Sequence, residues 1–181
     1  MKQFLFCLLS TLLLSTSPVF ADSSTASSAP AMTLKTNGFL NKMAIPTLYT
    51  CDGKDVSPQI SWSNVPPKTI VLALIMKDID APGGIFYHWA LFNIPTTITE
   101  LAEGAALPAG ASMAFNNFNK AAYSGPCPPK GNAHTYIFTL YALDSKLILP
   151  ADVDGASVVK ALEGHIIGQV DLTGIYSRWV Q

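Results

Sequence analysis

Two aspartates and two histidines lie beside strand-like segments in the middle of this chain, and these residue types can build a polar ligand site. Asp78 and Asp80 are two positions apart, so in an extended segment both carboxylates point to the same side. His88 and His134 each open a strand-like segment, which predicts that both lie at the rim of a β domain. A carboxylate that accepts a hydrogen bond from an imidazole fixes its tautomer and favours its charged form. A charged imidazole can then bind phosphate oxygens, so the four residues suggest an anion pocket.

Spacing alone also allows purely structural roles for these residues. Aspartates are common in turns, where one of this pair would cap the turn at Ala81-Pro82 and the other would be solvated. A single histidine is more often a structural residue than a ligand. The presence of two histidines beside the pair of acids, with a glycine- and proline-rich loop between them, favours the site. That loop is Tyr123-Ser124-Gly125-Pro126-Cys127-Pro128-Pro129-Lys130-Gly131.

Four segments in this order resemble the phosphatidylethanolamine-binding protein family, in its bacterial branch of Raf-kinase-inhibitor-like proteins. They are Asp78–Pro82, His88–Leu91, Tyr123–Gly131 and His134–Asp144. The resemblance extends from about Phe39 to Arg178 and implies that these segments converge on one pocket. By their place in the motifs, the anion-binding positions are Asp78, Asp80, His88, Gly125, His134 and Tyr136, and the wall positions are Pro82 and Trp89.

The expected pocket chemistry follows from these residue types. Backbone N–H groups near Gly125 would receive anion oxygens, and Tyr136 would add a hydroxyl donor. Two residues depart from the family pattern. Ile79 stands where the family usually has proline, and Cys127 stands where the animal members carry glycine. We therefore expect a bulkier rim than in those members.

Hydrophobic patterns predict several strands and a helical C-terminal part. The continuous apolar run at 70–76 predicts a strand buried on both faces. Alternation predicts strands at 88–94 and 134–143, whereas spacing of three and four predicts helices at 156–163 and 165–172. The expected faces are His88, Ala90 and Phe92 opposite Trp89 and Leu91, and His134, Tyr136, Phe138 and Leu140 opposite Ile137, Thr139 and Tyr141.

These elements predict a mostly β, single-domain fold. Proline and glycine recur at short intervals, and 104–118 is expected to be a long irregular connection. The family resemblance makes the architecture more specific and implies a sandwich of two antiparallel sheets with peripheral C-terminal helices.

The N-terminal residues are expected to be a targeting segment outside the fold. Lys2, an apolar stretch at 4–14 and Val19-Phe20-Ala21 form the pattern of a signal peptide at 1–21, with an uncleaved membrane anchor as the alternative. A Ser/Ala/Pro-rich tether is predicted at 22–32 and the family domain at 33–181. We therefore expect an exported protein, periplasmic or secreted.

The charge of the chain limits which ligands it can bind, and its cysteines limit which cross-links it can form. The formal net charge of the whole chain is −1 and no basic run occurs, which argues against nucleic acid as a partner. With Cys7 removed in the signal peptide, Cys51 and Cys127 remain, and an even count in an oxidising compartment predicts a disulfide. The alternative is two separate thiols, one buried and one lining the pocket. Two cysteines do not form a metal site.

The sequence therefore favours an exported binding protein that is not an enzyme, needs no cofactor or metal, and takes a small anion such as a phospholipid head group. One alternative is a hydrolase in which Asp78, Asp80, His88 and His134 bind a divalent metal. No H-E-x-x-H or G-x-S-x-G motif supports it. Another alternative is a module that binds or inhibits a protein through a surface patch. Whether the chain forms a homodimer, and which protein it would bind, stay open.

Overall fold

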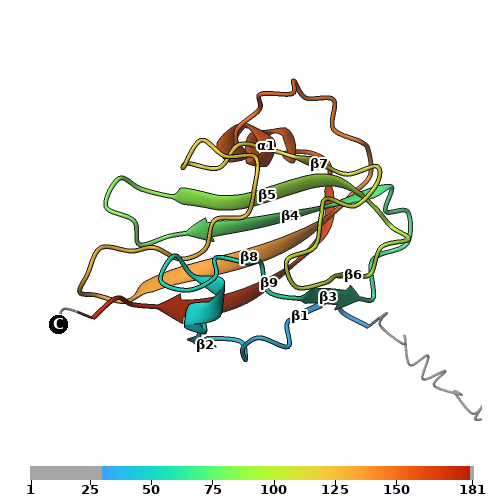
Figure 1. The fold of residues 1–181 in the computed structure, drawn as a ribbon. Coiled ribbons are helices and arrows are strands. Elements are labelled where there is room, and N and C mark those ends of the chain that lie inside the picture. The colour runs from blue at the N-terminus through green and yellow to red at the C-terminus, as the bar shows by residue number, and fades with distance from the viewer. Residues whose placement is uncertain (1–29, 180–181) are drawn as a thin grey trace, which may run out of the picture.

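The computed structural model describes residues 30–179, so the predicted signal peptide at 1–21 and most of the tether at 22–32 lie outside the described residues. The described part is mostly β, as predicted, with a single α-helix in this range (Figure 1). Its elements are β1 Thr33–Lys35, β2 Met43–Ala44, the 3-10 helix η1 Thr47–Tyr49, β3 Ile60–Ser63, β4 Val71–Asp78, β5 Phe86–Pro95, β6 Glu100–Leu101, β7 Ser112–Met113, β8 His134–Leu143, α1 Gly155–Ala161 and β9 Ile166–Tyr176.

The strands form two sheets. The larger sheet has the order β2-β9-β8-β4-β5-β7 and the smaller has the order β1-β3-β6. The smaller sheet is antiparallel, but β2 runs parallel to β9, so the prediction of two purely antiparallel sheets is wrong at this edge. Gly174 on β9 allows this arrangement, because a side chain there would collide with Ile45 and Phe39 in the segment around β2.

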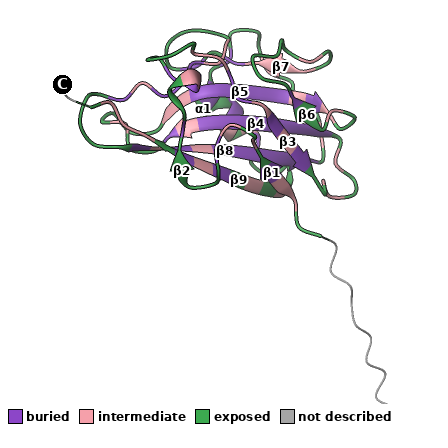
Figure 2. Ribbon diagram, turned by 60° about the horizontal axis from the view of Figure 1, so that its bottom comes forward, coloured by how far each residue is buried: buried purple, intermediate pink, exposed green. Residues whose placement is uncertain are grey.

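The central strand β4 is buried on both faces, as its apolar run predicted. It pairs with β5 on one side and β8 on the other. Leu72, Leu74 and Met76 pack into a core shared with the smaller sheet, whereas Val71 and Ile75 pack toward α1 on the opposite face. Figure 2 shows the buried central strands lying behind β1 and β3. The layers are therefore a small sheet on one face of the large sheet and a helix on the other.

The C-terminal part differs from the prediction of two helices. The first helix is confirmed as α1, where the Asp154 side chain caps the N-terminus by accepting from Ser157 N at 2.7 Å. The second predicted helix, at 165–172, is wrong, because these residues belong to strand β9. Its apolar spacing resembles that of a helix, but Ile166, Ile167 and Val170 are β-branched, and the whole length of β8 pairs with this strand. Within residues 30–179, no helix is long and apolar enough to cross a membrane.

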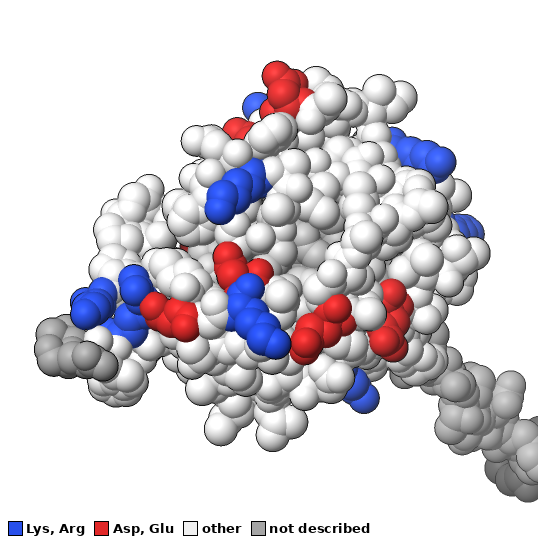
Figure 3. All heavy atoms as spheres, viewed as in Figure 1, with Lys and Arg blue, Asp and Glu red and all other residues white. Residues whose placement is uncertain are grey.

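The strand ends that build the site lie together at one end of the large sheet. The end of β4 pairs with the starts of β5 and β8, since Asp78 lies opposite Phe86 on one side and Tyr136 on the other. This end is at the left of Figure 1. On the face seen in Figure 3, lysines, arginines and acidic residues are scattered around a wide uncharged area. No extended basic surface is present on that face.

Candidate functional site

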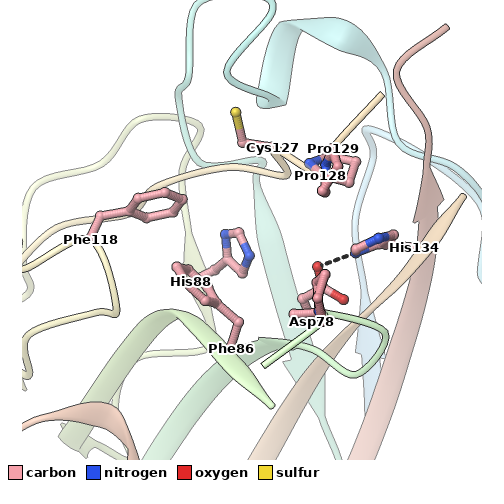
Figure 4. Close-up of a pocket in the computed structure, with 10 residues that line it drawn as sticks. Asp78, Phe86, His88, Phe118, Cys127, Pro128, Pro129 and His134 are labelled. Atoms are coloured by element: carbon pink, nitrogen blue, oxygen red, sulfur yellow. Dashed lines mark hydrogen bonds and ion pairs between the residues drawn. The ribbon is translucent and has the colours of Figure 1, made fainter. Parts of the chain in front are cut away.

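A small cavity opens at this end of the sheet. Its volume is about 150 Å³, well below the roughly 300–1,000 Å³ of sites for drug-sized ligands. It therefore suits a small ion or head group. The described residues that line it include no lysine or arginine, so apart from the histidines Asp78 is its one ionisable lining residue. The lining residues are Asp78, Ala81, Pro82, Phe86, His88, Phe118, Cys127, Pro128, Pro129 and His134 (Figure 4).

Asp78 and His134 form a buried pair in this cavity. Asp78 ends β4 and is 3% exposed, and His134 opens β8 and is 8% exposed. His134 Nδ1 lies 2.7 Å from Asp78 Oδ2, and Asp78 Oδ1 accepts from Asp80 N at 2.9 Å. Because an ionised carboxylate only accepts, His134 carries its proton on Nδ1. Nε2 is then the ring atom left for a ligand.

His88 reaches the same cavity from β5 through a bulge. Met76 pairs with Trp89 and Lys77 pairs with Tyr87, so His88 is an extra residue between them without a partner on β4. The bulge turns His88 toward the cavity, where its ring lies 5.3 Å from that of Tyr136. The predicted sharing of a face with Ala90 and Phe92 is therefore wrong for His88. Its position as the first residue of the strand is also wrong, since β5 begins at Phe86.

The His88 ring is oriented by a backbone carbonyl. Its Nδ1 lies 2.8 Å from Ser124 O, and a carbonyl can only accept, so Nδ1 carries the proton. The residue is 2% exposed, and burial lowers the pKa of His88, although the hydrogen bond to Ser124 and the charge of Asp78 oppose this. His88 is thus mainly neutral at pH 7, with Nε2 as an acceptor.

Tyr136 lies beneath the cavity rather than on its wall. It faces Asp78 across the β4–β8 ladder and is fully buried. Among the described residues, its hydroxyl is one of two buried side-chain polar atoms without a hydrogen-bond partner. Burial, aided by the charge of Asp78, raises the pKa of Tyr136, so the hydroxyl keeps its proton and can donate.

Asp80 lines a second hollow, which adjoins the first across Pro82, Pro129 and His134. The Asp80 Oδ2 atom accepts from Thr135 N at 2.7 Å, and hydrogen bonding to Thr135 lowers the pKa of the carboxyl. The two aspartates, predicted to act on one side, therefore line neighbouring hollows. Pro82 lines both of them, as its predicted wall position requires.

Trp89 and Gly125 do not line the cavity. Trp89 lines a separate apolar cavity with Leu91, Leu101 and Met113. Gly125 is buried, and its N–H donates to Asp55 Oδ1 at 2.6 Å, so this amide is already occupied. The loop amide expected to hold an anion thus has a structural partner instead.

The predicted disulfide between Cys51 and Cys127 is present, with the two Cα atoms 5.4 Å apart. Cys127 lines the cavity, so the bridge ties the rim to the segment around Cys51. Sequence reasoning missed Phe86 and Phe118, whose rings lie 4.8 Å apart and line the cavity beside His88. Phe86 continues the alternation of β5 toward its start, but no local pattern distinguishes Phe118 in its loop.

Chemistry elsewhere in the described chain is limited. Ser145, His165 and Asp144 are neighbours where β8 ends and β9 begins, but Ser145 Oγ (2.9 Å) and Asp144 Oδ1 (3.0 Å) both approach the same nitrogen, His165 Nδ1. A catalytic triad needs its serine and its acid on opposite nitrogens of the histidine. Within residues 30–179, no group of three or more His, Cys, Asp or Glu side chains is placed to hold a metal.

Comparison with known proteins gives a consistent result. The family model described as phosphatidylethanolamine-binding protein matches residues 35–177. A UPF0098 protein of Methanothermobacter thermautotrophicus is 44% identical over 81% of this chain and 99% of its own length. One from Aquifex aeolicus is 40% identical over 81% of this chain and 89% of its own.

Two crystal structures are similar in fold and sequence. The putative phosphatidylethanolamine-binding protein homolog CT736 of Chlamydia trachomatis has a TM-score of 0.76 and 35% identity, over 82% of this chain and 98% of its own. YbcL of E. coli, described as a new member of the mammalian PEBP family, has a TM-score of 0.78 and 32% identity, over 82% and 99%.

Proposed function

The chain belongs to the phosphatidylethanolamine-binding protein family, and from that premise we propose that it is an exported binding protein without catalytic activity. Its ligand is a small phosphorylated or carboxylated head group, like that of a phospholipid, bound in the cavity beside Asp78, His88 and His134. The apolar stretch at 4–14 and the Cys51–Cys127 disulfide support a location outside the cytoplasm.

The observation that carries this proposal is the common state of the two histidines. In both rings Nδ1 is committed as a donor, to Asp78 in one case and to Ser124 in the other. Each ring therefore offers only Nε2 to the cavity. A neutral ring presents an acceptor there, which repels an anion, whereas a protonated ring presents a charged donor. Binding of an anion is thus coupled to uptake of a proton.

The surroundings of the rings support a small head group rather than a free polar ion. Phe86, Phe118 and the two prolines at 128 and 129 form an apolar wall beside the histidines. Such a wall excludes water and strengthens the attraction between an imidazolium and an anion. The buried Tyr136 hydroxyl, which has no partner, is a further donor near this wall.

A catalytic role has less support from the same residues. Cys127, the one cysteine in the cavity wall, is committed to a disulfide. The metal-assisted hydrolase finds no support within the described residues, because Asp78, Asp80, His88 and His134 do not form a metal-binding group. Asp80 lies in the adjoining hollow instead.

Calorimetric titration across pH tests the proposal. Sulfate is the reference probe because its charge is constant between about pH 5.5 and pH 8, the range in which imidazoles titrate. Phosphoethanolamine is the head-group probe. We expect sulfate affinity to rise by up to about tenfold for each unit of falling pH, the limit set by uptake of one proton.

Histidine variants identify the source of the proton. His134→Gln and His88→Gln each keep a hydrogen-bonding side chain without the charge, and the double variant should bind sulfate weakly at all pH values. His165→Gln is the matched control, since His165 is exposed and lies just before β9, outside the cavity lining. Affinity that does not change with pH, or a pH profile that survives in the double variant, contradicts the proposal.

A further inference from the structure

The two sides of one peptide group connect Asp55 with His88. The carbonyl of Ser124 accepts from His88 Nδ1 at 2.8 Å. The N–H of Gly125, which belongs to the same peptide bond, donates to Asp55 Oδ1 at 2.6 Å. A carboxylate that accepts from a peptide N–H polarises the amide group. The carbonyl oxygen of that group then carries more negative charge and is a better hydrogen-bond acceptor.

We propose that Asp55 is a positioning residue for the cavity, which acts on His88 through the Ser124–Gly125 peptide group and favours the form of the ring that binds an anion. This inference rests on the proposed function, because it concerns the same site. Asp55 does for His88, through one peptide, what Asp78 does directly for His134. A partner behind a ligand-binding histidine is a known way to fix its tautomer and raise its basicity.

The local backbone is built around this contact. Asp55 has a φ of +55°, a left-handed conformation that aspartate adopts at some cost. Gly125 cannot be replaced without movement, because a Cβ atom there would collide with Tyr49 O and lie 2.8 Å from Asp55 Oδ1. The glycine thus lets the peptide approach the carboxylate closely. Its role is to present the peptide to Asp55 and not to hold the ligand with its own amide.

The charged and titratable groups around His88 come from four segments. Asp78 lies on β4, His134 and Tyr136 lie on β8, and Asp55 precedes β3. Lys120 and Asp55 line a small hollow that is separate from the cavity, and Phe118 and Cys127 line both. Burial lowers the pKa of His88, and the nearby charges of Asp78 and Asp55 oppose the effect. Asp55 is the one of these groups that also touches the peptide holding the ring.

The first experiment needs no ligand. Nitrogen-15 NMR of the imidazole rings reports the tautomer and the pKa of each histidine. Asp55→Asn keeps an oxygen that can accept from Gly125 N–H but removes the charge. We expect His88 to keep its proton on Nδ1 while its pKa falls by about half a unit, in line with the loss of one nearby favourable charge. The NMR signals of His134 should keep their wild-type positions, because Asp78 still accepts from that ring.

Two further variants separate the peptide contact from the electric field of the carboxylate. Asp55→Glu keeps the charge but moves it away from Gly125 N–H. We expect the pKa of His88 to fall below its wild-type value in this variant, as in Asp55→Asn. Asp52→Asn is the matched control. It removes a carboxylate from the same segment, but the Asp52 carboxylate contacts Tyr176 and Arg178 and not Gly125. A wild-type pKa of His88 in Asp55→Glu, or an unchanged pKa in Asp55→Asn, overturns the inference.

Sulfate titration then connects the inference to the site. At pH 6, Asp55→Asn should weaken sulfate binding by about threefold, the factor that corresponds to half a pKa unit. In the His88→Gln background the same substitution should cause no further loss, and a loss of equal size there overturns the inference. If the wild type does not bind sulfate at any pH, the proposed function fails, whereas the NMR measurements still decide the role of Asp55.

Discussion

The two histidines of the cavity both donate a hydrogen bond through Nδ1, but their rings are held by different parts of the molecule. His134 is held by Asp78, and both lie at paired ends of β8 and β4. His88 is held by Ser124 in a loop, and that loop is held by Asp55 from another loop. One half of the cavity therefore belongs to the central sheet, and the other half belongs to contacts between irregular segments.

The loop half is secured by several separate ties. Tyr123 donates its hydroxyl to Tyr49 O at 2.7 Å, and Cys51 N donates to Pro126 O at 3.2 Å. The disulfide between Cys51 and Cys127 adds a covalent tie between the same two segments. The hydrogen bonds between neighbouring strands thus fix the position of the His134 ring. The loop that holds His88 has no such continuous pairing, and several separate contacts fix it instead.

Removal of the disulfide should cause the largest loss of stability. It should alter the structure of the loop half of the cavity only. In the chain-entropy model, a bridge that spans 76 positions is worth roughly 4–5 kcal/mol, as an upper value. We expect the double variant Cys51→Ser, Cys127→Ser to lose much of this in the free energy of unfolding, measured by urea denaturation. The NMR signals of His88 should broaden or shift, because its loop is loosened.

The His134–Asp78 pair is the internal control for that variant, and its NMR signals should stay at their wild-type positions. A variant in which both histidines change equally would contradict the division into a sheet half and a loop half. A variant as stable as the wild type would show that the hydrogen bonds between the two segments suffice without the bridge.

Loss of the Asp78 side chain should have the second largest effect, on the sheet half. Asp78→Ala leaves both His134 Nδ1 and Asp80 N without their acceptor, and the His134 ring is buried. The cost of breaking a buried, hydrogen-bonded pair is about 3 kcal/mol or more. Asp78→Asn retains an acceptor and should cost less. Chemical denaturation of both variants checks the order, and an Asp78→Ala variant no less stable than Asp78→Asn would contradict it.

The division into two halves also explains which parts of the site could be predicted from sequence. The sheet half could be predicted because alternation in β8 places His134 and Tyr136 on one face, and Asp78 follows closely on the apolar run of β4. These are local patterns with a fixed period. The cysteine pair could be predicted because few partners were available for each cysteine.

Apart from the disulfide, the contacts of the loop half could not be predicted, because they join distant segments without a repeating pattern. The bulge interrupts the alternation of β5 at His88, the residue of this strand whose imidazole enters the site. Asp55 carries no local signal that it will meet Gly125, which is 70 positions away. The family resemblance located the pocket in the chain, but it did not identify which amides were already occupied.

The smallest predicted effect concerns Asp80, which borders the sheet half from the adjoining hollow. Its carboxylate accepts from Thr135 N, next to His134, and hydrogen bonding to Thr135 lowers the pKa of Asp80. A lowered folded-state pKa stabilises the fold fully above the unfolded value of about 3.9, and this contribution is lost as pH falls through the folded value. Because Asp80 is exposed, we expect Asp80→Asn to cost less than about 1 kcal/mol at pH 7.

The difference in unfolding free energy between wild type and Asp80→Asn should therefore shrink as pH falls below the unfolded value of about 3.9. Asp154→Asn is a useful reference, because the hydrogen bond from Ser157 also lowers the pKa of Asp154, but at the start of α1. Both variants should show the same direction of pH dependence. Only Asp80→Asn should also change the NMR signals of His134, since Thr135 follows that ring directly in β8. A stability difference that grows as pH falls would mean that Asp80 is held in its neutral form, contrary to its contact with Thr135.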